Sequence, residues 1–374
     1  MTIPFIDLKA QFRELEDAIR SGIDRVLEHG RFIMGPEVQE LETVLGRFAG
    51  VKHVISCSSG TDALLMPLMA YGIGPGDAVF TTTFTFVATA EVISLLGATP
   101  VFVDIDSRTF NINPEQLAAA IEKTRATGTL KPRGVITVDL FGLPADYDSI
   151  ASVADENDLF VLEDAAQSFG ALYKGRNAGS LGHVAATSFF PAKPLGCYGD
   201  GGAVFTNDDE LAAKLRSIRI HGQGSDKYQN VRIGINGRLD TLQAAILLPK
   251  LKAFRGELEA RQRVAERYHS ALDNVVETPY VPDGYTSAWA QYSVLSDNRT
   301  QVQAVLKDAG IPTAIYYPKP LHLQSAYAHL GQGQGVFPES EAAAQRIFSL
   351  PFHPYLDQET QRTVVDAVAK AVTA

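Results

Sequence analysis

Short apolar runs rich in β-branched residues alternate with stretches of helical period through the first 250 residues. Runs of this length and composition are typical of buried strands, and the stretches between them have the spacing of helices that cover a sheet. The alternation predicts an α/β fold with a mainly parallel sheet and helices on both of its faces. The runs are residues 54–57, 78–82, 101–103, 135–138, 159–163, 186–190 and 203–206.

The pattern changes near residue 250. Residues 251–272 are charged and helical in period, and they follow Pro249 near the end of a helix rich in alanine and leucine. We therefore predict a large domain over residues 1–250 and a smaller C-terminal domain over residues 251–374. The stretch up to Glu28 also has a helical pattern, which is compatible with packing against either domain.

Composition and charge narrow the class of protein. A chain of 374 residues with 45% hydrophobic and 20% charged side chains can bury a large core in two unequal domains. The formal net charge of −10 argues against a general nucleic-acid binder. An anionic substrate would therefore need a local basic site.

Cysteine content and hydropathy indicate the cellular compartment. Cys57 and Cys197 form neither a disulfide framework nor a cluster with metal-ligand spacing, which fits a reducing cytoplasm and a protein without a metal. Residues 1–4 lack the basic and apolar segments of a signal peptide, and no apolar run is long enough to span a bilayer. We expect a soluble, cytoplasmic protein without a membrane partner.

A turn of small polar residues, 58–61, follows the run that ends at Cys57 and precedes an apolar helix. Free backbone N–H groups at a helix start, together with the Thr61 hydroxyl, can bind a phosphate dianion. The alternative is an ordinary strand-to-helix turn capped by serine or threonine.

A carboxylate, Asp164, follows the run 159–163 at the end where open α/β sheets place ligand-binding groups. It could keep a pyridine nitrogen protonated and so turn the ring into an electron sink. A cap for the following segment is the alternative role. Gln167 could donate a hydrogen bond to a ring oxygen, although a lone glutamine is usually polar surface.

Lys193 lies in residues 188–196, a stretch too aromatic and apolar for an ordinary surface lysine. Desolvation lowers the pKa of an amine and favours the neutral nucleophile that forms a Schiff base. A lysine that extends from a loop into solvent is the alternative. Asp164, Ser188 and the glycine-rich turn 199–202 make the chemical role the better interpretation.

Taken together, these motifs closely resemble those of the DegT/StrS family of sugar-nucleotide aminotransferases. The likeness covers essentially the whole chain, and several motifs in one order are far more specific than any one of them. The segments that carry the resemblance are residues 5–8, 163–168, 188–202, 219–222, 234–238 and 350–354.

The resemblance implies a fold type I aminotransferase, with a large pyridoxal-phosphate domain and a smaller C-terminal domain. It makes Lys193 the residue that carries the cofactor as a Schiff base and Asp164 the partner of the pyridine nitrogen. Gln167 would lie near the ring hydroxyl. Phe86 would stack on the ring face, although an aromatic side chain in this position is also typical of a core.

The same resemblance assigns the cofactor phosphate to Gly60, Thr61 and Ser188. Asn236 of a partner subunit would join them, which implies a homodimer with shared active sites. From the residues alone, Asn236 is a turn residue between two glycines.

The family also implies a reaction. L-glutamate would aminate pyridoxal phosphate, and the resulting pyridoxamine phosphate would aminate a keto-sugar nucleotide, with Lys193 as anchor, acid and base. Related sugar dehydratases carry histidine in place of this lysine, so Lys193 argues against that activity. Residues 188–202 and 238–245 look most like enzymes that aminate a UDP-linked 3-keto-2-acetamido-hexuronic acid for surface polysaccharide synthesis.

Three side chains are candidates for binding the sugar. Arg238 could grip a carboxylate bidentately, with an ion pair inside the fold as the alternative. Tyr317 and His322 are candidates for reaching the sugar, and core or surface roles are open for both. Tyr316 stands where similar enzymes carry histidine in a His-Tyr-Pro motif, which leaves the exact sugar open. A 4-keto sugar nucleotide is the alternative substrate.

A regulatory protein is the alternative of a different class, because related folds can bind the cofactor without catalysis. Such a regulator would carry a DNA-reading module, and no basic helix-turn-helix pattern precedes Phe5. A purely structural role would leave the clustered motifs unexplained. We therefore expect an enzyme.

Overall fold

The computed structural model describes residues 3–373 and contains a central seven-stranded sheet in the order β1-β9-β8-β5-β4-β2-β3. Strand β9 is antiparallel to both of its neighbours, and the other neighbouring pairs are parallel. The predicted mainly parallel α/β sheet is confirmed, and every predicted run overlaps a strand. The strands are β1 (His53–Cys57), β2 (Asp77–Thr82), β3 (Thr99–Val103), β4 (Lys131–Val138), β5 (Phe160–Asp164), β8 (Val184–Ser188) and β9 (Gly202–Thr206).

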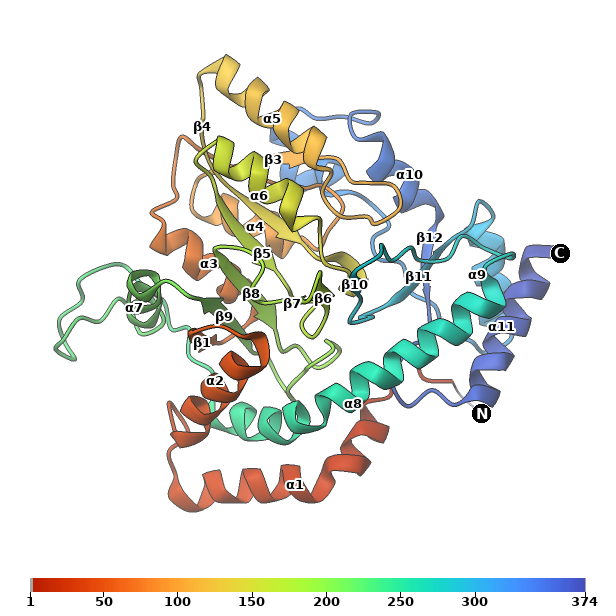
Figure 1. The fold of residues 1–374 in the computed structure, drawn as a ribbon, viewed down its shortest axis with the longest axis horizontal. Coiled ribbons are helices and arrows are strands. Elements are labelled where there is room, and N and C mark those ends of the chain that lie inside the picture. Colours follow the sequence, from red (N-terminus) through yellow and green to blue (C-terminus); the bar gives the residue numbers. More distant parts are fainter. Residues whose placement is uncertain (1–2, 374) are drawn as a thin grey trace.

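Helices cover both faces of this sheet (Figure 1). Successive apolar residues point to opposite faces of a strand, and accordingly Leu162 packs with the cluster of α3, α4 and α7 while Val161 packs with that of α5 and α6. Continuous apolar runs are therefore required where both faces are buried. The covering helices are α2 (Pro36–Ala49), α3 (Gly60–Ala70), α4 (Ala88–Leu95), α5 (Pro114–Thr127), α6 (Tyr147–Glu156) and α7 (Asp209–Ile218).

Helix α8 (Thr241–Leu272) continues through Pro249, where the sequence pattern had indicated the end of a helix. Proline removes a donor, so the carbonyl of Ala245, four residues earlier, loses its helical partner. Helix α1 (Leu8–His29) packs against α8 at this point, and a Cβ added to Gly22 would lie 2.9 Å from that carbonyl oxygen. The N-terminal helix therefore lies closely against α8 around the proline (Figure 1).

The elements after α8 surround a separate apolar cluster that includes Tyr268, Tyr292, Phe348 and Val364. The division of the chain at residue 250 remains a prediction. Among the described residues, no helix is both long and apolar enough to cross a membrane. The later elements are the strands β10 (Tyr285–Thr286), β11 (Tyr292–Leu295) and β12 (Ile347–Leu350), the helices α9 (Arg299–Asp308), α10 (Pro338–Arg346) and α11 (Gln358–Thr373), and the short 3-10 turns η2 (Leu321–Leu323) and η3 (Ser325–Leu330).

Three short elements complete the described fold. Strand β6 pairs with both β7 and β10 in a small antiparallel sheet, and a 3-10 turn follows β4. They are β6 (Leu172–Tyr173), β7 (Arg176–Asn177) and η1 (Leu140–Gly142).

Candidate active site

A cavity of about 480 Å³ lies at the carboxyl ends of β1, β4, β5 and β8. Residues of the C-terminal segment close it from the other side, so it combines parts of the chain that are far apart in sequence. A larger groove of about 540 Å³ beside α8 contains none of the predicted site residues. The predicted residues that line the smaller cavity are Gly60, Thr61, Phe86, Asp164, Gln167, Ser188, Lys193 and Tyr317.

One end of the cavity is built by the turn between β1 and α3. Ser59 caps the helix by accepting a hydrogen bond from the Asp62 N–H at 3.0 Å. The N–H groups of Gly60 and Thr61 have no preceding turn of helix to bind, so they are suited to an anion. A Cβ on Gly60 would lie 2.6 Å from the Ser188 Cβ, and glycine therefore allows the turn to approach the end of β8.

The carboxylate of Asp164, at the end of β5, is buried with 6% of the residue exposed. Its Oδ2 accepts a hydrogen bond from the Thr89 hydroxyl at 2.9 Å, and its Oδ1 accepts one from the Ala166 N–H at 3.2 Å. Burial raises the pKa of Asp164, while the charge of Lys193 and these two donors oppose the rise. The carboxylate thus caps the next turn and also faces the cavity.

Lys193 belongs to the loop that follows β8. Its N–H donates to the Phe190 carbonyl at 2.9 Å, and the Cys197 N–H donates to the Phe189 carbonyl at 2.7 Å, which folds the loop back on itself. Burial lowers the pKa of the Lys193 amine, and the nearby Asp164 carboxylate partly offsets that effect. The lower pKa increases the neutral fraction of the amine, which is the nucleophilic form.

Gln167 is held between two segments. Its Oε1 accepts a hydrogen bond from the Phe141 N–H at 2.6 Å, and its Nε2 donates to the Tyr317 hydroxyl at 3.4 Å. The Tyr317 ring lies 6.4 Å from that of Phe86, which is 55% exposed. Phe86 and Tyr317 therefore form two aromatic walls, and Gln167 fixes one of them.

Three predicted residues do not line the cavity of their own chain. Asn236 is exposed, although the adjacent Gly237 carbonyl accepts a hydrogen bond from the Ser58 N–H at 3.2 Å. Arg238 is half-buried, and its Nε is buried with no hydrogen-bond partner among residues 3–373. His322 is buried, and both of its ring nitrogens contact protein groups. The roles of all predicted site residues toward ligands remain predictions.

Several cavity residues escaped the sequence analysis. Thr89 orients Asp164 from the start of α4, but a threonine in an apolar helix carries no distinguishing signal. Ile6 lies in the motif segment 5–8 but was not singled out, and Gln291 reaches the cavity from a segment outside the motifs. Gln291 also has an amide oxygen that is buried without a partner in the described part of the chain. In addition, no group of three or more His, Cys, Asp or Glu side chains within residues 3–373 could hold a metal ion.

A mostly parallel sheet with a buried carboxylate and a loop lysine at its carboxyl edge defines a fold type I aminotransferase. Residues 13–369 match the DegT/DnrJ/EryC1/StrS aminotransferase family, and the chain belongs to this family. The expected family, fold class and enzyme class are therefore confirmed.

Curated relatives match along nearly their whole length. The chain is 52% identical to the UDP-2-acetamido-2-deoxy-3-oxo-D-glucuronate aminotransferase of Pseudomonas aeruginosa, covering 98% of this chain and 99% of that one. It is 45% identical to a pleiotropic regulatory protein of Geobacillus stearothermophilus, covering 99% and 98%. Identity is 40% to a UDP-N-acetyl-3-dehydro-α-D-glucosamine 3-aminotransferase of Acidithiobacillus ferrooxidans, again covering 99% and 98%.

Solved structures agree with this assignment. A DegT/DnrJ/EryC1/StrS aminotransferase from Brucella abortus has a TM-score of 0.97 and 55% identity, covering 98% of this chain and 99% of that one. DesV from S. venezuelae, in complex with a ketimine intermediate, has a TM-score of 0.95 and 37% identity, covering 100% and 99%. NtdA from Bacillus subtilis, with bound cofactor PMP, has a TM-score of 0.89 and 29% identity, covering 99% and 83%.

Proposed function

We propose that this aminotransferase uses pyridoxal phosphate to move an amino group from L-glutamate to UDP-2-acetamido-2-deoxy-3-oxo-glucuronate. The observation that carries the proposal is the presence of Lys193, Asp164 and an anion-binding turn around one cavity. The 52% identity to an aminotransferase named for this sugar supports the choice of acceptor. The product would be a 3-amino sugar for surface polysaccharide synthesis in the cytoplasm.

The residues around the cavity fit the cofactor. Gly60, Thr61 and Ser188 offer N–H and hydroxyl donors to a phosphate at one end, where the Gly60 backbone lies against Ser188. Asp164 supplies a buried carboxylate for a protonated ring nitrogen. Bound cofactor in NtdA supports the assignment. When bound, the cofactor supplies an electron sink for the carbon that bears the amino group.

The protein supplies anchoring, proton transfer and orientation. The Lys193 amine holds the cofactor covalently between turnovers and, once released, its Nζ takes a proton from one carbon and returns it to another. The Asp164 carboxylate holds the proton on the ring nitrogen, and the Thr89 hydroxyl fixes the orientation of that carboxylate. Phe86 and Tyr317 limit the entry of water from two sides.

Arg238 does not line the cavity of its own chain, so it is the proposed partner of the sugar carboxylate at the site of the other subunit, beside Asn236. Its buried Nε lacks a partner within the described residues, and a guanidinium can form two parallel hydrogen bonds with a carboxylate. Tyr317 lines the cavity and can contact the sugar directly. His322 can affect the sugar through neighbouring groups, since its ring is buried.

The acceptor can be tested with a panel of keto-sugar nucleotides and L-glutamate. We expect efficient turnover of the 3-keto UDP-hexuronic acid, with mass spectrometry showing the keto oxygen replaced by an amine. 4-Keto dTDP- and GDP-hexoses are the controls. Efficient turnover of these hexoses alone would overturn the acceptor assignment and leave the family membership intact.

We further propose a homodimer in which Asn236 of one subunit contacts the phosphate held by the other. Asn236 is exposed and follows a segment in which Tyr228 and Ile233 are each 85% exposed, as expected for an apolar surface that a second subunit covers. The Gly237 carbonyl is bound to the phosphate-binding turn of its own chain, so this segment already lies beside one site.

Mixing two variants tests the shared site. Asn236→Ala should weaken cofactor retention and lower activity, and Lys193→Ala should abolish turnover. A heterodimer of the two has one site with both lesions and one intact site, so a random equal mixture should contain about a quarter of the wild-type number of intact sites and exceed the mean activity of the two separate variants. No recovery despite demonstrated heterodimers, or a fully active monomer in sedimentation at assay concentration, would contradict the model.

Two alternatives have specific support. A 4-keto acceptor stays the alternative because Tyr316, in the cavity wall, stands where similar enzymes carry histidine and leaves the exact sugar open. A regulatory role is suggested by the name of the Geobacillus relative. The complete set of lysine, carboxylate and phosphate donors favours catalysis, and the turnover assay above separates these possibilities.

A further inference from the structure

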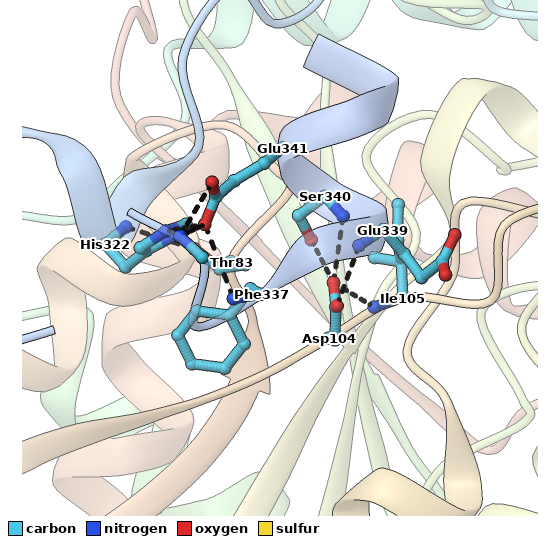
Figure 2. Close-up of polar contacts among 9 residues, drawn as sticks. Thr83, Asp104, Ile105, His322, Phe337, Glu339, Ser340 and Glu341 are labelled. Carbon is cyan, nitrogen blue, oxygen red and sulfur yellow. Dashed lines mark hydrogen bonds and ion pairs between the residues drawn. The ribbon is translucent and has the colours of Figure 1, made fainter. Parts of the chain in front are cut away.

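His322 is bracketed by a hydroxyl and a carboxylate from opposite sides (Figure 2). Its Nδ1 lies 2.8 Å from the Thr83 hydroxyl, and its Nε2 lies 3.1 Å from the Glu341 carboxylate. The His322 backbone N–H also donates to the Thr83 hydroxyl oxygen at 3.0 Å. One neutral tautomer satisfies all three contacts: Nε2–H donates to Glu341, and Nδ1 accepts from Thr83.

This carboxylate, imidazole and hydroxyl arrangement has the connectivity of a hydrolytic triad, but it is not one. Thr83 has no exposed surface and His322 only 2%, so no substrate can reach the hydroxyl. Burial lowers the pKa of His322, while Glu341 partly opposes that effect, and the neutral form is favoured. Thr83, His322 and Glu341 therefore connect three segments of the chain, and we call these three residues the joint.

The joint connects the two aromatic walls of the cavity. Thr83 directly follows β2 and leads into the segment that carries Phe86, while His322 follows the segment that carries Tyr317. A third contact reinforces the joint, because the Leu321 N–H donates to the Thr83 carbonyl at 2.8 Å. The buried Phe84 ring also packs edge-on against Tyr317, with 6.2 Å between the ring centroids.

Glu341, on α10, attaches His322 to the segment that leads into this helix. Its carboxylate also accepts hydrogen bonds from the Gly335 N–H at 2.8 Å and the Phe337 N–H at 3.4 Å, and the Phe337 ring packs on His322 at 4.8 Å. A neighbouring contact attaches the same helix without involving His322. Asp104 accepts hydrogen bonds from the Ser340 N–H and hydroxyl at the start of α10 (Figure 2).

We propose that His322 is a positioning residue that, through Thr83, sets the distance between the Phe86 and Tyr317 walls and thereby determines how tightly the keto sugar binds. The inference rests on the proposed function, in that a sugar nucleotide occupies the cavity that these walls line. It gives His322 a role in sugar binding without direct contact. Tyr317 is the side chain through which the joint acts.

The test compares Thr83→Val, which keeps the shape and removes the hydroxyl, with Thr83→Ser, which keeps the hydroxyl. We expect Thr83→Val to raise KM for the keto sugar about tenfold, the effect of losing one well-made hydrogen bond, with kcat changed much less. Thr83→Ser should restore KM to near the wild-type value. Thermal unfolding and cofactor content, measured on the same samples, show whether each variant is folded and loaded.

A double-mutant cycle with Tyr317→Ala, which removes the aromatic wall, separates positioning from general destabilisation. If Thr83 and His322 act through Tyr317, Thr83→Val should raise KM by no more than about twofold in the Tyr317→Ala background. Asp104→Asn is the matched control, because it loosens the same helix and should lower the unfolding temperature without raising KM. Glu341→Gln is a second, milder variant that keeps an acceptor for His322.

Independent effects of Thr83→Val and Tyr317→Ala on KM would overturn the proposal, as would an equal rise of KM in Asp104→Asn. The measurement uses whichever keto-sugar nucleotide the wild-type enzyme turns over. If the acceptor is a different keto sugar from the one proposed, this test can still be made. If the wild-type enzyme acts on no keto sugar, the proposed function itself is refuted.

Discussion

Replacing Lys193 by alanine is expected to lower kcat by at least about four orders of magnitude, because the variant loses both its covalent anchor and its proton carrier. General acid–base catalysis alone contributes about 10²–10⁴-fold, and loss of the anchor adds to that. The variant should still bind the cofactor through the phosphate-binding turn and Asp164. It should lose the near-ultraviolet to visible absorption of the lysine-bound cofactor.

Lys174→Ala is a suitable control, since Lys174 is an exposed lysine paired with Asp148 at 2.6 Å, outside the cavity. Its turnover and absorption should match those of the wild type. Normal transamination by Lys193→Ala, measured as 2-oxoglutarate release and amino-sugar formation, would refute the role assigned to this lysine.

Replacing Asp164 by asparagine is expected to lower kcat by about 10²–10³-fold, because a neutral amide cannot hold the proton on the ring nitrogen as a carboxylate does. The size and shape of the side chain are retained. Burial raises the pKa of Asp164, which means that the folded protein disfavours its charge, so the variant should unfold at no lower temperature than the wild type.

Thr89→Val provides a graded comparison, because it removes one donor to the Asp164 carboxylate and leaves the charge in place. Its kcat should fall by about tenfold at most, in keeping with one hydrogen bond to a charged group. Activity of Asp164→Asn within tenfold of the wild type, with full cofactor content, would show that this carboxylate does not act on the ring.

The fold was largely predictable because both faces of the sheet are buried. A strand covered on both sides must be apolar at successive positions, as Val161 and Leu162 are, and this leaves a continuous run in the sequence. The run 186–190 extends two residues beyond β8, since Phe190 is apolar but its N–H turns to the Ser188 hydroxyl. The sequence predicted that a helix ends near Pro249, but α8 continues through this proline. The packing of α1 on α8 at this point is not visible in the local sequence.

The residues that line the cavity were predictable where they end a strand within a motif, as Asp164 and Ser188 do. Thr89 and Gln291 were missed because tertiary folding alone brings them to the cavity, and Ile6 was missed because an isoleucine carries no chemical signal. His322 illustrates a different limit. A histidine near a tyrosine motif suggests a ligand contact. His322 is instead bound to Thr83, which is distant in sequence, and to Glu341, which lies on α10, and the sequence does not show that these residues meet.

The most direct test of the account is borohydride reduction of the purified protein followed by peptide mass spectrometry. Reduction makes the bond between a lysine and its cofactor permanent. We predict a single phosphopyridoxyl group, located on Lys193 within the tryptic peptide 177–214. An active enzyme that carries the group on a different lysine, or carries none, would contradict the central claim that Lys193 anchors the cofactor.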